Sequence, residues 1–180
     1  SYSVEQVLDA PFEDWDGDDL PDLFVALESQ PARLYLKQRG APMKLAAACA
    51  DWPQVDAFAV GDLNNDLRMD VAFLAADDIR IHTQGAETPV VLPLNGLHPS
   101  SLEMMDYDND GWLDLLAFGG DAFRVWRNRG LEGFTDVSES LGLNQLQMGD
   151  VQQIHKGDLD GDCDSDWILT LADQSIRLLR

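Results

Sequence analysis

The feature that most constrains the fold of this chain is a nine-residue acidic pattern that occurs four times. The four segments are DWDGDDLPD (14–22), DLNNDLRMD (62–70), DYDNDGWLD (106–114) and DLDGDCDSD (158–166). Their first aspartates are separated by 48, 44 and 52 residues. Recurrence at a period of about 20–50 residues is the signature of repeat architectures. We therefore expect four copies of one supersecondary unit.

Each acidic segment is followed by residues that predict β-strands. The apolar runs LFVAL, VAFLA, LLAFG and WILTL come first, and the alternating segments ARLYLK, IRIHTQ, FRVWRN and SIRLLR come next. Short apolar runs and period-two alternation are both strand signals. Further strands are predicted before the loops, in DAFAVGD and SLEMMD, and after the alternating segments, in MKLAA, PVVLPL and GFTDV. MKLAA would also suit a helix.

The predicted unit is a strand, an acidic loop and three more strands. Four-stranded units of this length are typical of β-propeller blades. The helices of about 10–15 residues that would separate parallel strands are missing from the sequence pattern. We therefore predict an all-β fold of four four-stranded blades in a single propeller-type domain over residues 1–180. The repeats span approximately 1–50, 51–96, 97–144 and 145–180.

The two ends of the chain bear on whether a propeller ring would close. The fourth repeat reaches Arg180 after its third predicted strand. The segment VEQVLDAPFED aligns with GDVQQIHKGD, the first strand of the fourth repeat, so only Tyr2 to Val4 would remain for closure. We expect an open, partial propeller that belongs to a longer chain or is completed by further blades or a second copy. A closed four-bladed ring is the alternative.

The acidic segments carry oxygen donors at a spacing that suits a metal ion. Positions one, three, five and nine offer side-chain oxygens, and position seven would offer its backbone carbonyl. Several hard oxygen donors without sulfur or imidazole select calcium. The predicted ligands are Asp14, Asp16, Asp18, Leu20 and Asp22; Asp62, Asn64, Asp66, Arg68 and Asp70; Asp106, Asp108, Asp110, Trp112 and Asp114; and Asp158, Asp160, Asp162, Asp164 and Asp166.

These loops differ from the EF-hand, which needs a bidentate Glu at its twelfth position. The twelfth residues here are Val25, Phe73, Ala117 and Leu169, which cannot bind a metal through their side chains. Position four is Gly17, Asn65, Asn109 or Gly161, the residue types that tolerate the left-handed backbone of a tight loop.

A solvated acidic turn is the alternative for any one segment, but four copies at the same place in a repeat favour metal binding. We expect up to four calcium ions. The third and fourth sites should be the strongest. The site at 62–70 should be the weakest, because Asn64 replaces a carboxylate and Leu67 stands where a small residue fits best.

The charge of the chain limits its partners. It has 33 acidic and 12 basic residues and a net charge of −21, so it should repel nucleic acid and anionic membrane surfaces. Apolar stretches of about 20 residues, as membrane insertion requires, are absent from the sequence. Bound cations would relieve the repulsion among the carboxylates. Isolated Asp-rich loops in extracellular modules often bind calcium in the range of about 10⁻⁴–10⁻³ M, which suits a protein outside the cytoplasm.

One stretch resembles a known family. MDYDNDGWLDLLAFGG, continuing to FRVWRNRGLEGFTDVSESLGL, is similar to the FG-GAP/VCBS repeats of integrin alpha subunits, especially the cartilage acidic protein and ASPIC type. The resemblance extends to all four repeats, although the second departs from it at positions four and six. It implies a β-propeller whose loops hold calcium through the positions given above. It also implies an extracellular, periplasmic or cell-surface protein that binds proteins or glycans.

Two classes of function remain open. The first is a non-catalytic, calcium-binding scaffold or adhesion module with a protein or glycan ligand. The second is part of a propeller enzyme such as a polysaccharide lyase. Phosphate loops, zinc signatures and nucleophile elbows are absent from the sequence, and a carboxylate that binds calcium stays ionised and is a poor acid. A lyase would need basic or tyrosine side chains clustered in a cleft outside the loops. We expect the first class.

Overall fold

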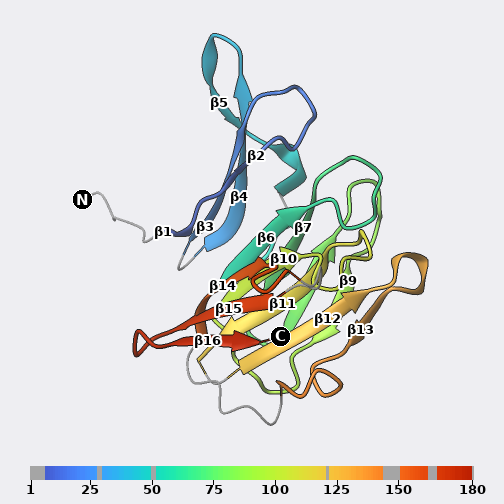
Figure 1. The fold of residues 1–180 in the computed structure, drawn as a ribbon. Coiled ribbons are helices and arrows are strands. Elements are labelled where there is room, and N and C mark those ends of the chain that lie inside the picture. The colour runs from blue at the N-terminus through green and yellow to red at the C-terminus, as the bar shows by residue number, and fades with distance from the viewer. Residues whose placement is uncertain are drawn as a thin grey trace. The chain divides into compact units, whose positions relative to one another are not determined.

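The computed structural model describes residues 7–27, 30–49, 52–120, 122–143, 151–161 and 166–179. Tyr2 to Val4, Asp162 and Asp164 therefore lie outside the described residues. The chain divides into two compact units, Ser1–Pro93 and Leu94–Arg180. Each unit contains two antiparallel sheets, and each sheet lies within one predicted repeat (Figure 1).

The first unit is built from nine strands within the described residues. Its first sheet consists of β1 (Val7–Asp9), β2 (Phe12–Glu13), β3 (Asp22–Leu27), β4 (Gln30–Gln38) and β5 (Ala41–Leu45), in the order β1-β3-β4-β5 with β2 also paired to β3. A 3-10 turn, η1 (Ala47–Cys49), follows. The second sheet consists of β6 (Ala57–Gly61), β7 (Asp70–Leu74), β8 (Asp78–His82) and β9 (Val90–Pro93), paired in that order.

The second unit repeats this meander. Its first sheet consists of β10 (Ser101–Met105), β11 (Asp114–Gly119), β12 (Ala122–Asn128) and β13 (Phe134–Asp136), with the 3-10 turn η2 (Gly130–Glu132) before β13. Its other sheet consists of β14 (Val151–Gly157), β15 (Asp166–Leu171) and β16 (Ile176–Leu179). The predicted all-β class with four blade-like repeats is confirmed, and the four sheets are consistent with a partial propeller.

The strand that follows each acidic loop is the most buried of its sheet. Every residue of β7 and of β11 is buried, which explains why these strands read as continuous apolar runs. In β8, by contrast, Ile79 and Ile81 are buried while Arg80 is exposed, so that strand alternates. The ambiguous segment MKLAA contributes its first residues to β5, which pairs with β4 and is largely exposed.

Each unit has its own hydrophobic core, formed by side chains of both of its sheets. In the first unit, Phe24 of β3 stacks on Trp52 with ring centroids 6.0 Å apart, and Trp52 meets Phe73 of β7 edge-on at 4.9 Å. In the second unit, Phe123 of β12 contacts Trp167 of β15 at 6.0 Å. Aromatic pairs at such distances add to the stabilisation from burial.

Candidate metal centre

Each acidic loop connects two antiparallel strands and is closed by a residue pair at its base. The pairs are Glu13↔Asp22, Gly61↔Asp70, Met105↔Asp114 and Gly157↔Asp166. The ninth-position aspartate is therefore the first residue of the buried strand. This position fixes the loop to the edge of a rigid sheet.

The ninth-position aspartates are buried and accept hydrogen bonds from the backbone. Asp22, Asp70 and Asp114 have 0% exposure and Asp166 has 4%. Their Oδ2 atoms accept the position-two N–H at 3.0, 3.1, 3.0 and 2.8 Å, respectively. The Oδ1 atoms of the first three accept an N–H of the next strand or its end, from Lys37 at 2.6 Å, Gln84 at 3.0 Å and Asn128 at 2.7 Å. These carboxylates tie loop and sheet together, a role that the sequence reasoning missed.

Burial also changes the acidity of these groups. Desolvation disfavours the charged form of a carboxyl. It raises the pKa of Asp114 to about 6 in the metal-free protein, although the N–H groups of Asn128 and Tyr107 oppose the shift. The pKa of Asp70 is raised for the same reason. A cation beside these carboxylates would favour their ionised form.

The first-position aspartate organises the turn itself. Asp14 accepts N–H groups from Gly17, Asp18 and Asp19 at 2.9, 3.1 and 2.9 Å. Asp106 accepts those of Asp110 and Gly111 at 3.1 and 3.0 Å. Asp62 and Asp158 make similar bonds in their loops. Backbone hydrogen bonds to this carboxylate therefore hold the loop in its curled form.

The backbone of the loops is left-handed at two positions. At position four, Gly17, Asn65, Asn109 and Gly161 have φ values of 75°, 57°, 58° and 81°, as predicted. Position six is also left-handed where it is described, with φ of 63° at Asp19, 66° at Leu67 and 87° at Gly111. Leu67 is thus a non-glycine residue in a conformation that costs energy.

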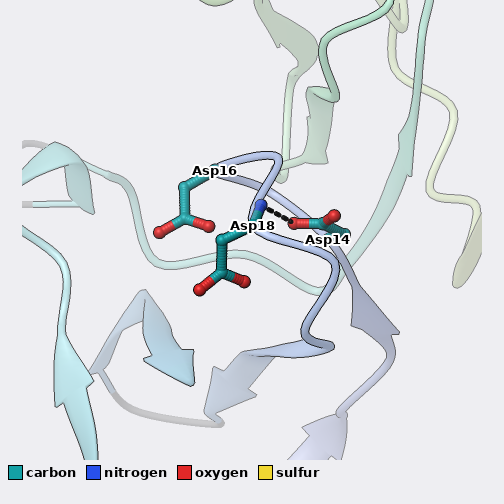
Figure 2. Close-up of side chains that lie close together, drawn as sticks. All are labelled: Asp14, Asp16 and Asp18. Atoms are coloured by element: carbon teal, nitrogen blue, oxygen red, sulfur yellow. Dashed lines mark hydrogen bonds between the residues drawn. The ribbon is translucent and has the colours of Figure 1, made fainter. Parts of the chain in front are cut away.

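Among the described residues, three groups of aspartates could hold a metal ion. They are Asp14, Asp16 and Asp18; Asp106, Asp108 and Asp114; and Asp158, Asp160 and Asp166, each with ligand atoms within 4.8 Å of one another. Figure 2 shows the first group, with the Asp18 N–H bonded to Asp14 at 3.1 Å. Burial and the charges of Asp18 and Asp22 raise the pKa of Asp16. Such a concentration of like charge favours cation binding.

One buried oxygen of the third group also fits the binding of a cation. Asp108 Oδ1 is buried and accepts no hydrogen bond. A buried carboxylate oxygen without a partner carries a desolvation cost that a cation would remove. The donor set, which consists of carboxylates, is the one that calcium prefers.

The second loop differs from the others. Its acids Asp62, Asp66 and Asp70 do not form such a group, and position three is the amide Asn64. Arg68 lies on Asp66, with Nη2 2.7 Å from Oδ2, and this contact lowers the pKa of Asp66. Asn64 also donates to Asp66 Oδ2 at 3.2 Å. Arg68 and Asn64 therefore already bond to Asp66 Oδ2, an oxygen that a calcium ion would otherwise use.

Two basic side chains contact the third loop and were not singled out from the sequence. Arg127 of β12 places Nη2 2.7 Å from Asp108 Oδ2 and 2.9 Å from Asp110 Oδ2. Lys156 of β14 donates to Asn109 Oδ1 at 2.8 Å and to the Asp106 carbonyl. Arg127 comes 13 residues after Asp114, and Lys156 precedes the fourth loop rather than the third, so the position of neither in the sequence signals these contacts.

The position-seven residues are placed by their own N–H groups. Those of Leu20, Arg68 and Trp112 donate to the position-five carboxylate at 2.9, 2.9 and 3.0 Å. The carbonyl ligands predicted at these residues remain predictions. Asp164 and Asp162, predicted for the fourth loop, lie outside the described residues.

Together, the sheets and loops define an all-β repeat module that carries acidic loops between its strands. A family model described as an FG-GAP-like repeat matches residues 14–73 and 106–169, and the chain belongs to this family. Each match starts at the first aspartate of one loop and ends in the strand after the next loop. A search of curated proteins finds no match. The chain is therefore a propeller-like repeat module of a kind often used for binding.

Within the described ranges, no helix has the length and apolar character needed to cross a membrane.

Proposed function

We propose that this chain is a non-catalytic, calcium-binding propeller module that acts as a scaffold or binds a protein or glycan outside the cytoplasm. The observation that carries the proposal is the first loop. Asp14, Asp16 and Asp18 bring ligand atoms within 4.8 Å of one another, and no described lysine or arginine forms an ion pair with them. A hard cation would neutralise this charge.

The calcium ligands proposed are the side chains at positions one, three, five and nine, with the position-seven carbonyl. Calcium would supply positive charge and cross-link residues of one loop. The site at 62–70 is proposed to be the weakest of up to four, since Asn64 supplies no charge and Arg68 already pairs with Asp66 at 2.7 Å. Bound ions would also reduce the net charge of −21.

The proposed location is extracellular, periplasmic or at the cell surface. Loops of this kind often bind calcium at about 10⁻⁴–10⁻³ M, a concentration found outside cells rather than in the cytoplasm. The net charge of −21 argues against nucleic acid as the partner. It also leaves neutral or basic surfaces of proteins and glycans as the partners that electrostatics favours.

A cavity of about 320 Å³ in the first unit bears on the non-catalytic part of the proposal. It is lined by Trp15, Trp52, His82, Thr83, Gln84, Gly85 and Ala86. Its one titratable side chain is His82, so it lacks the cluster of basic or tyrosine side chains that a lyase would need. Burial, together with the charge of Arg80, lowers the pKa of His82.

The test is a thermal melt of the protein in EDTA, in millimolar calcium and in millimolar magnesium. Each site stabilises the fold by about 2.7 kcal/mol at a hundredfold excess of calcium over Kd. We expect calcium to raise the midpoint strongly and magnesium to raise it little. Asp16→Asn should reduce the shift, and the matched variant Asp19→Asn, at a non-ligand position of the same loop, should not. If the midpoint is the same in all three solutions, the proposal is wrong.

A further inference from the structure

The position-five carboxylate is arranged alike in the three loops that are described in full. In Asp18, Asp66 and Asp110, Oδ1 accepts the N–H of the residue two positions later, at 2.9, 2.9 and 3.0 Å. This bond belongs to the turn. The second oxygen, Oδ2, lies outside it and is the more open of the two to a cation or a guanidinium, although Oδ1 keeps a second lone pair.

What contacts this second oxygen differs among the loops. In the second loop, Arg68 donates to Asp66 Oδ2 from Nη2 at 2.7 Å and from Nε at 3.2 Å. In the third, Arg127 Nη2 lies 2.9 Å from Asp110 Oδ2. In the first, Asp18 instead lies in the aspartate group with Asp14 and Asp16 (Figure 2). No ion pair reaches Asp18 from any described residue.

The sequence explains why each arginine serves only one loop. At position seven, Arg68 corresponds to Leu20 and Trp112 in the other two loops. In the strand registers, Leu23 pairs with Tyr35, Val71 with His82 and Leu115 with Trp126. The residue that follows each of these partners therefore has the same place in its repeat. Arg127 in the third repeat corresponds to Leu36 in the first and Thr83 in the second. The first repeat therefore has leucine at both places and cannot neutralise its own loop in this way.

We propose that Arg68 and Arg127 compete with the metal ion for the position-five carboxylate, so that the first loop binds calcium more tightly than the second and third. This order replaces the expectation from the sequence that the third site is among the strongest. This inference rests on the proposed calcium binding. A guanidinium on a carboxylate oxygen satisfies its charge and places a positive group where the cation would approach. Calcium must displace the arginine or bind with one ligand fewer. Asp108 Oδ1 remains without a partner, so the third site is weakened rather than lost.

The alternative to competition is that Arg127 strengthens the third site. A side chain outside a metal site can orient a ligand and strengthen binding. In that case Arg127 would hold Asp108 so that Oδ1 faces the ion. The two roles predict opposite signs for the removal of the arginine, which makes them separable by experiment.

The test is a calcium titration of the full chain followed by amide NMR, with one reporter for each loop. The N–H groups of Gly17, Leu67 and Gly111 lie inside the first, second and third loops. The variants are Arg127→Leu and Arg68→Leu, which introduce the residues that the first repeat has at these places. Arg129→Leu is the matched control, since Arg129 is exposed and forms no ion pair within the described chain. Unchanged spectra outside the loops verify folding.

In the unmodified protein, we expect the Gly17 signal to respond at a lower calcium concentration than Leu67 or Gly111. Arg127→Leu should lower the midpoint at Gly111 by about 1.5-fold to fivefold, which is the range that ion pairs at partly exposed sites supply. Arg68→Leu should do the same at Leu67. Arg129→Leu should change neither midpoint.

Three results would overturn the inference. A higher midpoint at Gly111 in Arg127→Leu would show that the arginine supports the site. If calcium still binds but the Gly111 midpoint is the same in Arg127→Leu and Arg129→Leu, then Arg127 does not compete with calcium. In that case the proposed calcium binding stands and only the inference is wrong. If no loop amide responds to calcium in any variant, both the inference and the proposed function are wrong.

Discussion

At the scale of single residues, the ninth-position aspartate differs from the other aspartates of its loop because it is buried and holds the loop to the sheet. Asp114 is fully buried and accepts backbone N–H groups from Tyr107 and Asn128 at 3.0 and 2.7 Å. Asp110 is exposed, and its bonds are to Trp112 in the same turn and to Arg127. Both were predicted as ligands from the spacing alone, but only the structure separates their roles.

We expect Asp114→Ala to destabilise the protein even in EDTA. The substitution leaves two backbone donors without a charged acceptor, at a cost of about 2–4 kcal/mol. Asp110→Ala should change the free energy of unfolding in EDTA by less than about 1 kcal/mol, since its contacts are exposed. Urea denaturation of both variants in EDTA measures the difference. Similar losses in the two variants would contradict the structural role of position nine.

At the scale of the element, each loop is a strand connection with a left-handed residue at positions four and six. The position-four conformation follows from the Gly and Asn residues there. The position-six conformation was not evident, because Leu67 is not a residue that normally indicates it and Asp19 indicates it less strongly than glycine. Leu67 keeps its side chain 93% exposed with φ of 66°. Its backbone strain is therefore not repaid by packing.

We predict that Leu67→Gly stabilises the metal-free protein by up to about 1 kcal/mol, because glycine adopts this conformation without steric cost. Gly111→Ala should destabilise it by about 1 kcal/mol, although a Cβ there meets no atom within 4 Å. Gly157→Ala is the control, since Gly157 has equal space and no positive φ. Denaturation in EDTA measures all three. A loss of stability in Leu67→Gly would refute the assignment of strain.

The strands were largely predictable, for a physical reason. The continuous runs in β7 and β11 reflect burial of every residue, and the alternation in β8 reflects burial of one face. The segment around β5 was ambiguous because Ala, Leu and Lys favour helix when isolated. The segment forms a strand because it pairs with β4. That pairing depends on residues outside the segment, so the segment alone does not predict it.

At the scale of the whole molecule, the fold class and the four loops could be predicted from the sequence because the same pattern recurs in every repeat. The contacts of the third loop could not be predicted in this way. Arg127 and Lys156 reach it from β12 and β14, and each depends on the reach of one side chain in one repeat. A pattern shared by all repeats carries no information about features that distinguish them. The replacement by Asn64 was visible in the sequence, but the side-chain contacts that distinguish the sites required a structure.

The central claim is that these loops are calcium sites, and anomalous X-ray diffraction from crystals grown in millimolar calcium tests it directly. We predict an anomalous peak in the first loop, bound by oxygens of Asp14, Asp16 and Asp18 at about 2.3–2.6 Å. A weaker peak or none is expected in the second loop. Crystals that show only water among the first-loop carboxylates at this calcium concentration would contradict the account.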